Sequence, residues 1–330
     1  MTTALHPRQA LFDPGEPSAP ALPVCDHYAG VEERMRKSLA LQARLGPVFD
    51  VTLDNEDGAP VGGEVEHARL IAELLDHADN RHGRVGVRVL PVAHPRFAEV
   101  LRTVVRAGRL PAYLMLPKPG SFADIERAVH AVDAAGGRKV PLHALIETHG
   151  ALRDVMAIAA HPRIESLSFG LMDFVSAHRG AIPLSAMGVP GQFEHPLVVR
   201  AKLEISAACH AYGKVPSHCV VTEFKHASAL QAAATRAARE FGYTRMWSIH
   251  PSQVETIIEA FSPTTAEVDL AVEILLAAQA AAWAPIRHRD TLHDRASYRY
   301  FWHVLERAHR TSTPDGPQLP AAVREAFFAA

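Results

Sequence analysis

Several features that mark other protein classes are scarce in this chain of 330 residues. It has only three cysteines, Cys25, Cys209 and Cys219, and their odd number and wide spacing argue against a disulfide framework or a zinc ribbon. Its 34 basic and 36 acidic side chains leave a net charge of −2, so no basic field favours nucleic acid or an anionic membrane surface as a partner. We therefore expect a cytoplasmic protein whose partners are small molecules.

Long apolar runs are also missing. A membrane-spanning helix needs ~20 apolar residues in succession, whereas the longest candidate, around 270–284, is interrupted by Glu273 and Gln279. The first twenty residues contain charges and prolines but no apolar core of a secretory signal, so we expect an N-terminal arm over residues 1–20.

Short β-prone runs alternate with segments that have the period of an amphipathic helix, which is typical of repeated βα units with parallel strands. Eight units would fit an open sheet or a closed barrel, but neither a G-x-G-x-x-G nor a Walker sequence follows any run. We therefore predict an α/β fold, a (β/α)8 TIM barrel over residues 21–262, with a C-terminal helical extension over 263–330. The predicted strands are Ala21–Cys25, Val48–Asp54, Arg84–Leu90, Ala112–Leu116, Leu142–Glu147, Ile164–Phe169, Val215–Val221 and Arg245–Ile249.

The carboxyl ends of barrel strands usually carry the chemistry, so polar residues that end apolar runs are candidates. Glu147 ends the fifth run and Asp173 follows the sixth. Mg²⁺ prefers oxygen ligands, often one or two carboxylates with water and substrate, and neither motif offers the Cys and His ligands that zinc favours. Each acid taken alone could equally be a helix cap or an ion-pair partner.

Two further groups follow strands two and three. Arg88 can form a bidentate fork with a carboxylate or a developing enolate oxygen, although a structural arginine that ties loops together is an equal alternative. Asp54, Glu56 and Asp57 form an acidic cluster that repels itself unless a cation or a donor offsets it. Such clusters occur near metal sites, and also as ordinary acidic loops.

Six segments between Val48 and Leu276, in the same order, resemble motifs of the citrate lyase β-subunit and HpcH/HpaI aldolase family. Asn55, Gly58 and Leu90 depart from the family's patterns. The six segments are VTLDNEDGAP, GVRVLP, LMLPKPGSFADIERAV, LIETHGAL, LSFGLMDF and SIHPSQVETIIEAF.

The resemblance implies a TIM barrel that binds Mg²⁺ through Glu147 and Asp173, with Arg88 on the substrate's carboxylate or carbonyl. It also implies that Glu56 and Asp57 organise the waters of the metal ion. A glycine in the FGLMD motif, Gly170, would let the backbone approach the site closely. Further candidates for substrate binding are Lys118, Met172 and His250, the last at the rim after strand eight.

These residues predict a Mg²⁺-dependent carbon–carbon lyase that acts on citryl-, malyl- or citramalyl-CoA-like substrates and releases an α-keto acid. The alternatives are an HpaI-like class II pyruvate aldolase acting on free hydroxy-oxo acids, and a non-catalytic scaffold subunit of an acyl-processing complex. A C-terminal Asp that acts as acid or base in malyl-CoA lyase relatives has no clear counterpart, since Asp290 and Asp294 are the only acids near that place.

Apolar residues are abundant near the end of the chain. The Ala-rich segment after Thr265 and the aromatics of Tyr298–Trp302 exceed what a finished barrel needs to cover, so they predict a core or a subunit interface. The family resemblance implies a homo-oligomer, a trimer or a hexamer.

Overall fold

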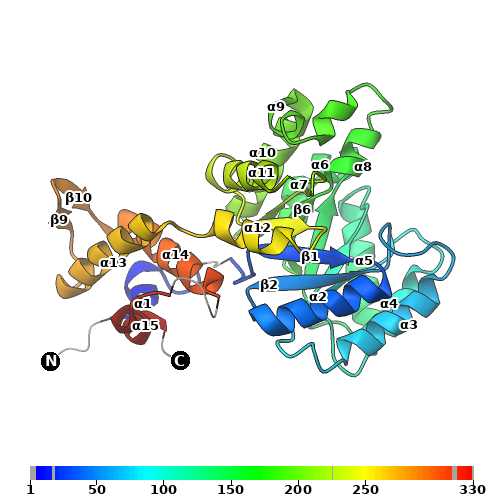
Figure 1. The fold of residues 1–330 in the computed structure, drawn as a ribbon, viewed down its shortest axis with the longest axis horizontal. Coiled ribbons are helices and arrows are strands. Elements are labelled where there is room, and N and C mark those ends of the chain that lie inside the picture. The colour runs from blue at the N-terminus through cyan, green and yellow to red at the C-terminus, as the bar shows by residue number, and fades with distance from the viewer. Residues whose placement is uncertain (1–4, 17–18, 225, 314–317, 329–330) are drawn as a thin grey trace. The chain divides into compact units, whose positions relative to one another are not determined.

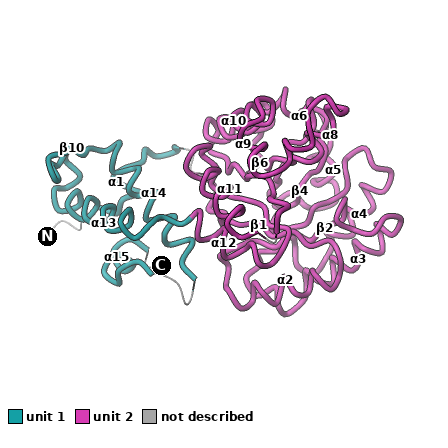
Figure 2. Tube along the Cα trace, turned by 45° about the horizontal axis from the view of Figure 1, so that its top comes forward, with its two compact units in different colours: residues 1–18, 262–330 teal, residues 19–261 magenta. Residues whose placement is uncertain are grey.

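The computed structural model describes residues 5–16, 19–224, 226–313 and 318–328 (Figure 1). The chain divides into two compact units, which are coloured separately in Figure 2. We call residues 19–261 the barrel unit and residues 1–18 with 262–330 the helical unit. The predicted N-terminal arm is thus part of the helical unit.

The barrel unit is the predicted closed barrel of eight parallel strands, in the order β1 to β8. β1 pairs with β2 on one side and with β8 on the other, which closes the sheet. The strands are β1 (Cys25–Ala29), β2 (Phe49–Asp54), β3 (Val85–Arg88), β4 (Leu114–Leu116), β5 (Leu142–Ile146), β6 (Ile164–Phe169), β7 (Val215–His218) and β8 (Arg245–Ser248).

The prediction for the first strand was wrong by four residues. The apolar run Ala21–Cys25 only leads into β1, which instead contains Asp26 and His27. These polar residues are buried because Asp26 accepts hydrogen bonds inside the barrel, from the hydroxyls of Thr52 at 2.7 Å and Tyr113 at 2.9 Å. A search for buried strands as runs of apolar residues cannot find a strand that contains buried polar residues.

Amphipathic helices cover the outside of the barrel. In α4, for example, Phe97, Val100, Leu101, Val104 and Val105 recur at helical spacing and are all buried. The helices of the barrel unit are α2 (Glu32–Leu45), α3 (Glu64–Leu75), α4 (Phe97–Val105), α5 (Phe122–Ala135), α6 (His149–Arg153), α7 (Val155–Ala160), α8 (Leu171–Ser176), α9 (Gly191–Glu194), α10 (Pro196–Ala211), α11 (Ala227–Arg239) and α12 (Gln253–Phe261), with a 3-10 turn at Leu184–Met187.

A layer of charged side chains lies inside the barrel near the amino-terminal ends of the strands. The guanidinium of Arg245 lies 2.6 Å from Asp50 and 3.0 Å from Asp26, and all three side chains are buried. Arg84 binds the same Asp50 carboxylate through two hydrogen bonds of 2.7 and 2.8 Å. Every charge here has a partner, as buried charges require.

An apolar layer follows along the same strands. Side chains two positions apart on a strand share a face, so Tyr28 and Trp247 lie one step beyond Asp26 and Arg245. They pack with Met115 and Leu145 into a separate buried cluster. The next step along the strands reaches their carboxyl ends, where the polar residues of the candidate site lie.

The helical unit has its own core. α1 (Pro7–Leu11), α13 (Thr265–Ala280), α14 (Arg295–Thr311) and α15 (Ala321–Phe328) contribute side chains to one buried cluster, and β9 (Ile286–His288) pairs with β10 (Thr291–His293).

Most of the aromatics that predicted a core or an interface belong to this cluster. Tyr298, Phe301 and Trp302 are buried in it, whereas Tyr300 is 58% exposed. Self-association as a trimer or hexamer therefore stays a prediction. No helix in the described ranges is long and apolar enough to cross a membrane.

The two acids near the end of the chain have local partners. Asp290 pairs with Arg287, and Asp294 caps α14 by accepting hydrogen bonds from two backbone N–H groups of its first turn.

The buried histidines make the barrel sensitive to acid. Burial lowers the pKa of His27 from 6.5 to about 4, and it also lowers the pKa values of His143 and His218. Between pH 6.5 and 4 the unfolded chain binds protons that the folded chain does not, so stability that is full above pH 6.5 is lost as the pH falls.

Through His27 the wild-type protein should lose about 2 kcal/mol of its unfolding free energy between pH 7 and pH 5. We expect the His27→Asn variant not to show this part of the loss. Urea unfolding at several pH values measures this. The exposed-site variant His82→Asn is the control and should keep the wild-type slope. An unchanged pH slope in His27→Asn would contradict the assignment.

Candidate active site

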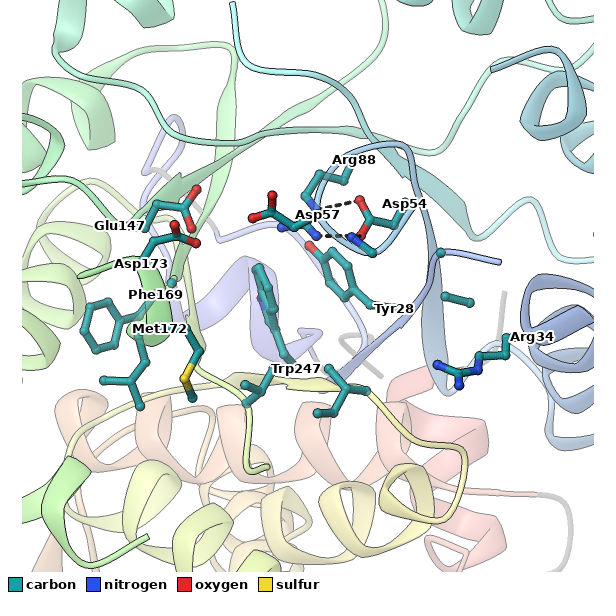
Figure 3. A pocket seen from close by; sticks show the side chains of 17 residues that line it. Tyr28, Arg34, Asp54, Asp57, Arg88, Glu147, Phe169, Met172, Asp173 and Trp247 are labelled. Carbon is teal, nitrogen blue, oxygen red and sulfur yellow. Dashed lines mark hydrogen bonds and ion pairs between the residues drawn. The ribbon is translucent and has the colours of Figure 1, made fainter. Parts of the chain in front are cut away.

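A cavity of about 300 Å³ opens at the carboxyl ends of the strands (Figure 3). Its wall combines charged groups from β2, β3, α8 and the position after β5 with aromatic side chains from β1, β6 and β8. The labelled lining residues are Tyr28, Arg34, Asp54, Asp57, Arg88, Glu147, Phe169, Met172, Asp173 and Trp247.

Two carboxylates lie side by side on one wall. Glu147 directly follows β5 and is 2% exposed, while the Asp173 side chain, in the first turn of α8, is 41% exposed. The backbone N–H of Lys118 donates to Glu147 Oε1 at 2.7 Å. Burial, and then the charge of Asp173, raises the pKa of Glu147 well above its usual value. A cation between the two acids would stabilise the charged form of Glu147 and offset its repulsion with Asp173.

The glycine after β6 leaves room for Glu147. A Cβ atom at Gly170 would lie 2.3 Å from Glu147 Oε2 and 2.5 Å from Glu147 Cβ. No side chain fits at that distance, so Gly170 is required for the observed position of the carboxylate. The sequence predicted that the backbone at Gly170 lies close to the site. In the structure, the group that it lies against is the Glu147 side chain.

Arg88 is held rigidly at the opposite wall. Its Nε and Nη2 donate to the two oxygens of Asp54 at 2.7 and 2.5 Å, and its Nη1 lies 3.1 Å from Glu56. Asp54 is itself fixed by the backbone N–H groups of Glu56 and Gly58, each at 2.9 Å. A guanidinium has five N–H donors, so Arg88 keeps donors for an anionic group in the cavity.

Lys118 joins the two acidic walls. Its Nζ donates to Glu56 and Asp57 at 2.6 Å each and lies 3.8 Å from Asp173. Burial opposes the charge of Lys118, but the hydrogen bonds that it donates to Asp57 and Glu56 outweigh burial and raise the pKa of Lys118. Lys118 therefore carries a charge that balances the acids.

The predicted site residues gather at this one end of the barrel. Those that line the cavity are Asp57, Arg88, Glu147, Gly170, Met172 and Asp173. Glu56 and Lys118 do not line it, but they bind residues that do.

His250 lies apart from the acids. It lines a neighbouring cavity of about 500 Å³, where its ring stacks on Phe224 with centroids 5.4 Å apart. Its contact with the substrate stays a prediction.

Sequence reasoning missed the aromatic part of the wall. Tyr28 and Trp247 stack with ring centroids 4.2 Å apart and planes 21° apart, although they come from opposite ends of the barrel sequence. The misplaced first strand hid Tyr28. The signal for Trp247 was its period of two with Arg245, which puts both side chains on the interior face.

The donor set fits a hard cation. In the described part of the chain, no three Asp, Glu, His or Cys side chains group as a metal cage. Two carboxylates at one wall match Mg²⁺, which typically takes one or two carboxylates and fills its octahedron with water and substrate oxygens.

Comparison with known sequences identifies the family of this chain. The family model for HpcH/HpaI aldolase/citrate lyase matches residues 40–251. An L-malyl-CoA/beta-methylmalyl-CoA lyase of Rhodobacter capsulatus is 28% identical over 250 residues, covering 70% of this chain and 77% of that protein. A (3S)-malyl-CoA thioesterase of Cereibacter sphaeroides is 29% identical over 239 residues, covering 71% and 77%.

Solved structures share the fold. A citrate lyase of Burkholderia xenovorans is 55% identical with a TM-score of 0.84, covering 98% of this chain and 100% of that one. The CitE protein of Mycobacterium tuberculosis, in complex with magnesium, acetoacetate and coenzyme A, has the same fold at 22% identity, with a TM-score of 0.68 over 87% of this chain and 98% of that one. The chain therefore belongs to the HpcH/HpaI aldolase/citrate lyase family.

Proposed function

We propose that this enzyme is a Mg²⁺-dependent lyase that breaks or forms the carbon–carbon bond between an acyl-CoA unit and an α-keto acid. The observation that carries the proposal is the placement of Glu147 and Asp173 opposite a rigid Arg88 across one cavity. Relatives named as malyl-CoA lyases, and the magnesium, acetoacetate and coenzyme A of the CitE complex, support this substrate class. Citryl-, malyl- and citramalyl-CoA are the proposed substrates.

In this proposal the keto-acid end of the substrate lies between the acid pair and Arg88. Glu147 and Asp173 would hold Mg²⁺, which when bound supplies a Lewis acid and a template for the keto-acid oxygens. Arg88 donates to the oxygen of the keto-acid end, which is negatively charged as an alkoxide before the carbon–carbon bond breaks. Because Asp54 already fixes its guanidinium, this stabilisation requires no reorganisation during the reaction.

Glu56 and Asp57 complete the acidic wall, and we assign them to orienting the waters around the ion. Burial raises the pKa of Glu56, although Arg88 and Lys118 oppose the shift. For Asp57 the balance is reversed: burial is outweighed by Lys118, and the pKa is lowered. Asp57 therefore keeps its charge at neutral pH.

Thioester hydrolysis is a second candidate, because a (3S)-malyl-CoA thioesterase is as similar to this chain as the malyl-CoA lyases are. The two reactions differ in their products. A lyase releases a keto acid and leaves the thioester intact, whereas a thioesterase releases a free thiol and no keto acid.

We expect the enzyme with Mg²⁺ to release a keto acid from at least one of malyl-, citramalyl- and citryl-CoA. Phenylhydrazone formation measures the keto acid, and a thiol reagent measures free CoA in the same sample. Thiol release without a keto acid would favour the thioesterase. Cleavage of a free 4-hydroxy-2-oxo acid, with no thioester turned over, would favour the class II aldolase.

We expect Glu147→Gln and Asp173→Asn to weaken Mg²⁺ binding by at least about tenfold, because each removes one anionic oxygen ligand. Calorimetric titration with Mg²⁺ and pyruvate measures the affinity, and circular dichroism checks the fold. Glu73→Gln, an exposed acid on α3, is the matched control. Wild-type affinity in both site variants would remove the proposed metal site.

We expect Arg88→Lys to lower kcat and kcat/KM by similar factors of about 10²–10³, since lysine keeps the charge but loses the planar fork. Steady-state kinetics on the thioester that the product assay identifies measures both constants. Arg102→Lys, at an exposed position of α4, should behave as wild type. A raised KM with an unchanged kcat would instead make Arg88 a ground-state anchor.

A further inference from the structure

Two hydrogen-bond donors from residues that line the cavity have no partner in the described part of the chain. The Tyr28 hydroxyl and the Trp247 indole N–H are both buried, and neither has a hydrogen-bond partner among the described residues. The two residues are only 8% and 7% exposed, yet both line the cavity. An unpaired buried donor costs about 1–3 kcal/mol of free energy. Binding of a hydrogen-bond acceptor to these two donors would therefore be favourable.

The two rings form a rigid platform. They stack 4.2 Å apart and pack against Met115 and Leu145 below. The guanidinium carbon of Arg88 lies 5.5 Å from the Tyr28 ring centre, which fixes the other side of the ring. In Figure 3 the platform faces the Glu147 and Asp173 pair. Donors held this way need no reordering when they bind an acceptor.

The chemistry of the two groups restricts what they recognise. An indole N–H can only donate. Burial, and then the charge of Asp26, raises the pKa of Tyr28 well above its usual value, so its phenol keeps its proton. The platform is therefore a neutral donor pair, which suits an oxygen acceptor and the negative charge that can develop on it.

The neighbouring cavity indicates which part of the substrate lies over the platform. It shares Tyr28, Arg34 and Ile249 with the first cavity and adds Lys37, whose ammonium group pairs with Glu33 at 2.6 Å. The guanidinium of Arg34, on the Tyr28 side, suits the anionic groups of the coenzyme A part of the substrate. The keto-acid end is assigned to the acid pair and Arg88, so the acyl carbonyl falls between the two, at the platform.

We propose that Tyr28 and Trp247 donate hydrogen bonds to the thioester carbonyl oxygen of the acyl unit and stabilise it as an enolate oxygen. The inference rests on the proposed lyase function. On cleavage the substrate hydroxyl loses its proton to a base and becomes the keto carbonyl. The electron pair of the broken C–C bond moves to the acyl α-carbon and onto the thioester oxygen, and the α-carbon then takes up a proton.

The test uses Tyr28→Phe and Trp247→Phe, which keep an aromatic ring and remove the donor. We expect kcat for thioester cleavage to fall about 10²-fold in each, as for loss of one donor to a developing oxyanion, with KM changed less than threefold. Exchange of the acetyl-CoA methyl protons with D₂O, in the presence of pyruvate, should fall in parallel because it forms the same enolate. Tyr212→Phe, an exposed tyrosine at the end of α10, should match wild type.

Calorimetry with Mg²⁺ and pyruvate completes the test, because the platform should not affect binding of the keto acid. Pyruvate affinity lost along with kcat would overturn the proposal and assign the platform to the keto acid. Wild-type kcat and exchange in both variants would overturn it as well. A wild-type enzyme that neither cleaves nor exchanges any thioester would instead refute the lyase function on which the proposal rests.

Discussion

The site depends on an excess of negative charge at the carboxyl ends of the strands. Five carboxylates meet two cationic partners there: Asp54, Glu56, Asp57, Glu147 and Asp173 against Arg88 and Lys118. Arg88 and Lys118 pair with the acids of β2 and its loop, although burial still raises the pKa of Glu56. The pKa of Glu147 is raised both by burial and by the charge of Asp173. The remaining charge imbalance lies at the Glu147 and Asp173 pair, which is where we propose that a divalent cation binds.

The charged layer inside the barrel provides the base for this arrangement. Arg245 bridges Asp26 on β1 and Asp50 on β2 from its own strand β8, so it ties three strands at the point where the barrel closes. Removing one partner of such a buried group typically costs about 3–5 kcal/mol. The rigid strands that result carry Tyr28, Asp54 and Trp247 to the cavity in a fixed register.

The sequence was sufficient for the barrel and for the strand-end acids, because a βα period and a polar residue after an apolar run are local signals. It was insufficient for β1, whose Asp26 and His27 are buried by partners far away in the chain. The platform of Tyr28 and Trp247 was missed for the same reason, since only barrel closure brings these rings together. Contacts between residues that meet only when the barrel closes cannot be predicted from a short stretch of sequence.

Lys118 shows how one residue couples the two walls. Its backbone N–H fixes Glu147, while its side chain holds Glu56 and Asp57 across the site. To do both, its backbone adopts a φ of 48°, a conformation that costs a non-glycine residue energy. The sequence predicted Lys118 as a substrate contact, and this stays a prediction. What the structure shows is that Lys118 binds carboxylates from both walls, because its backbone holds Glu147 while its ammonium group balances the charge of Glu56 and Asp57.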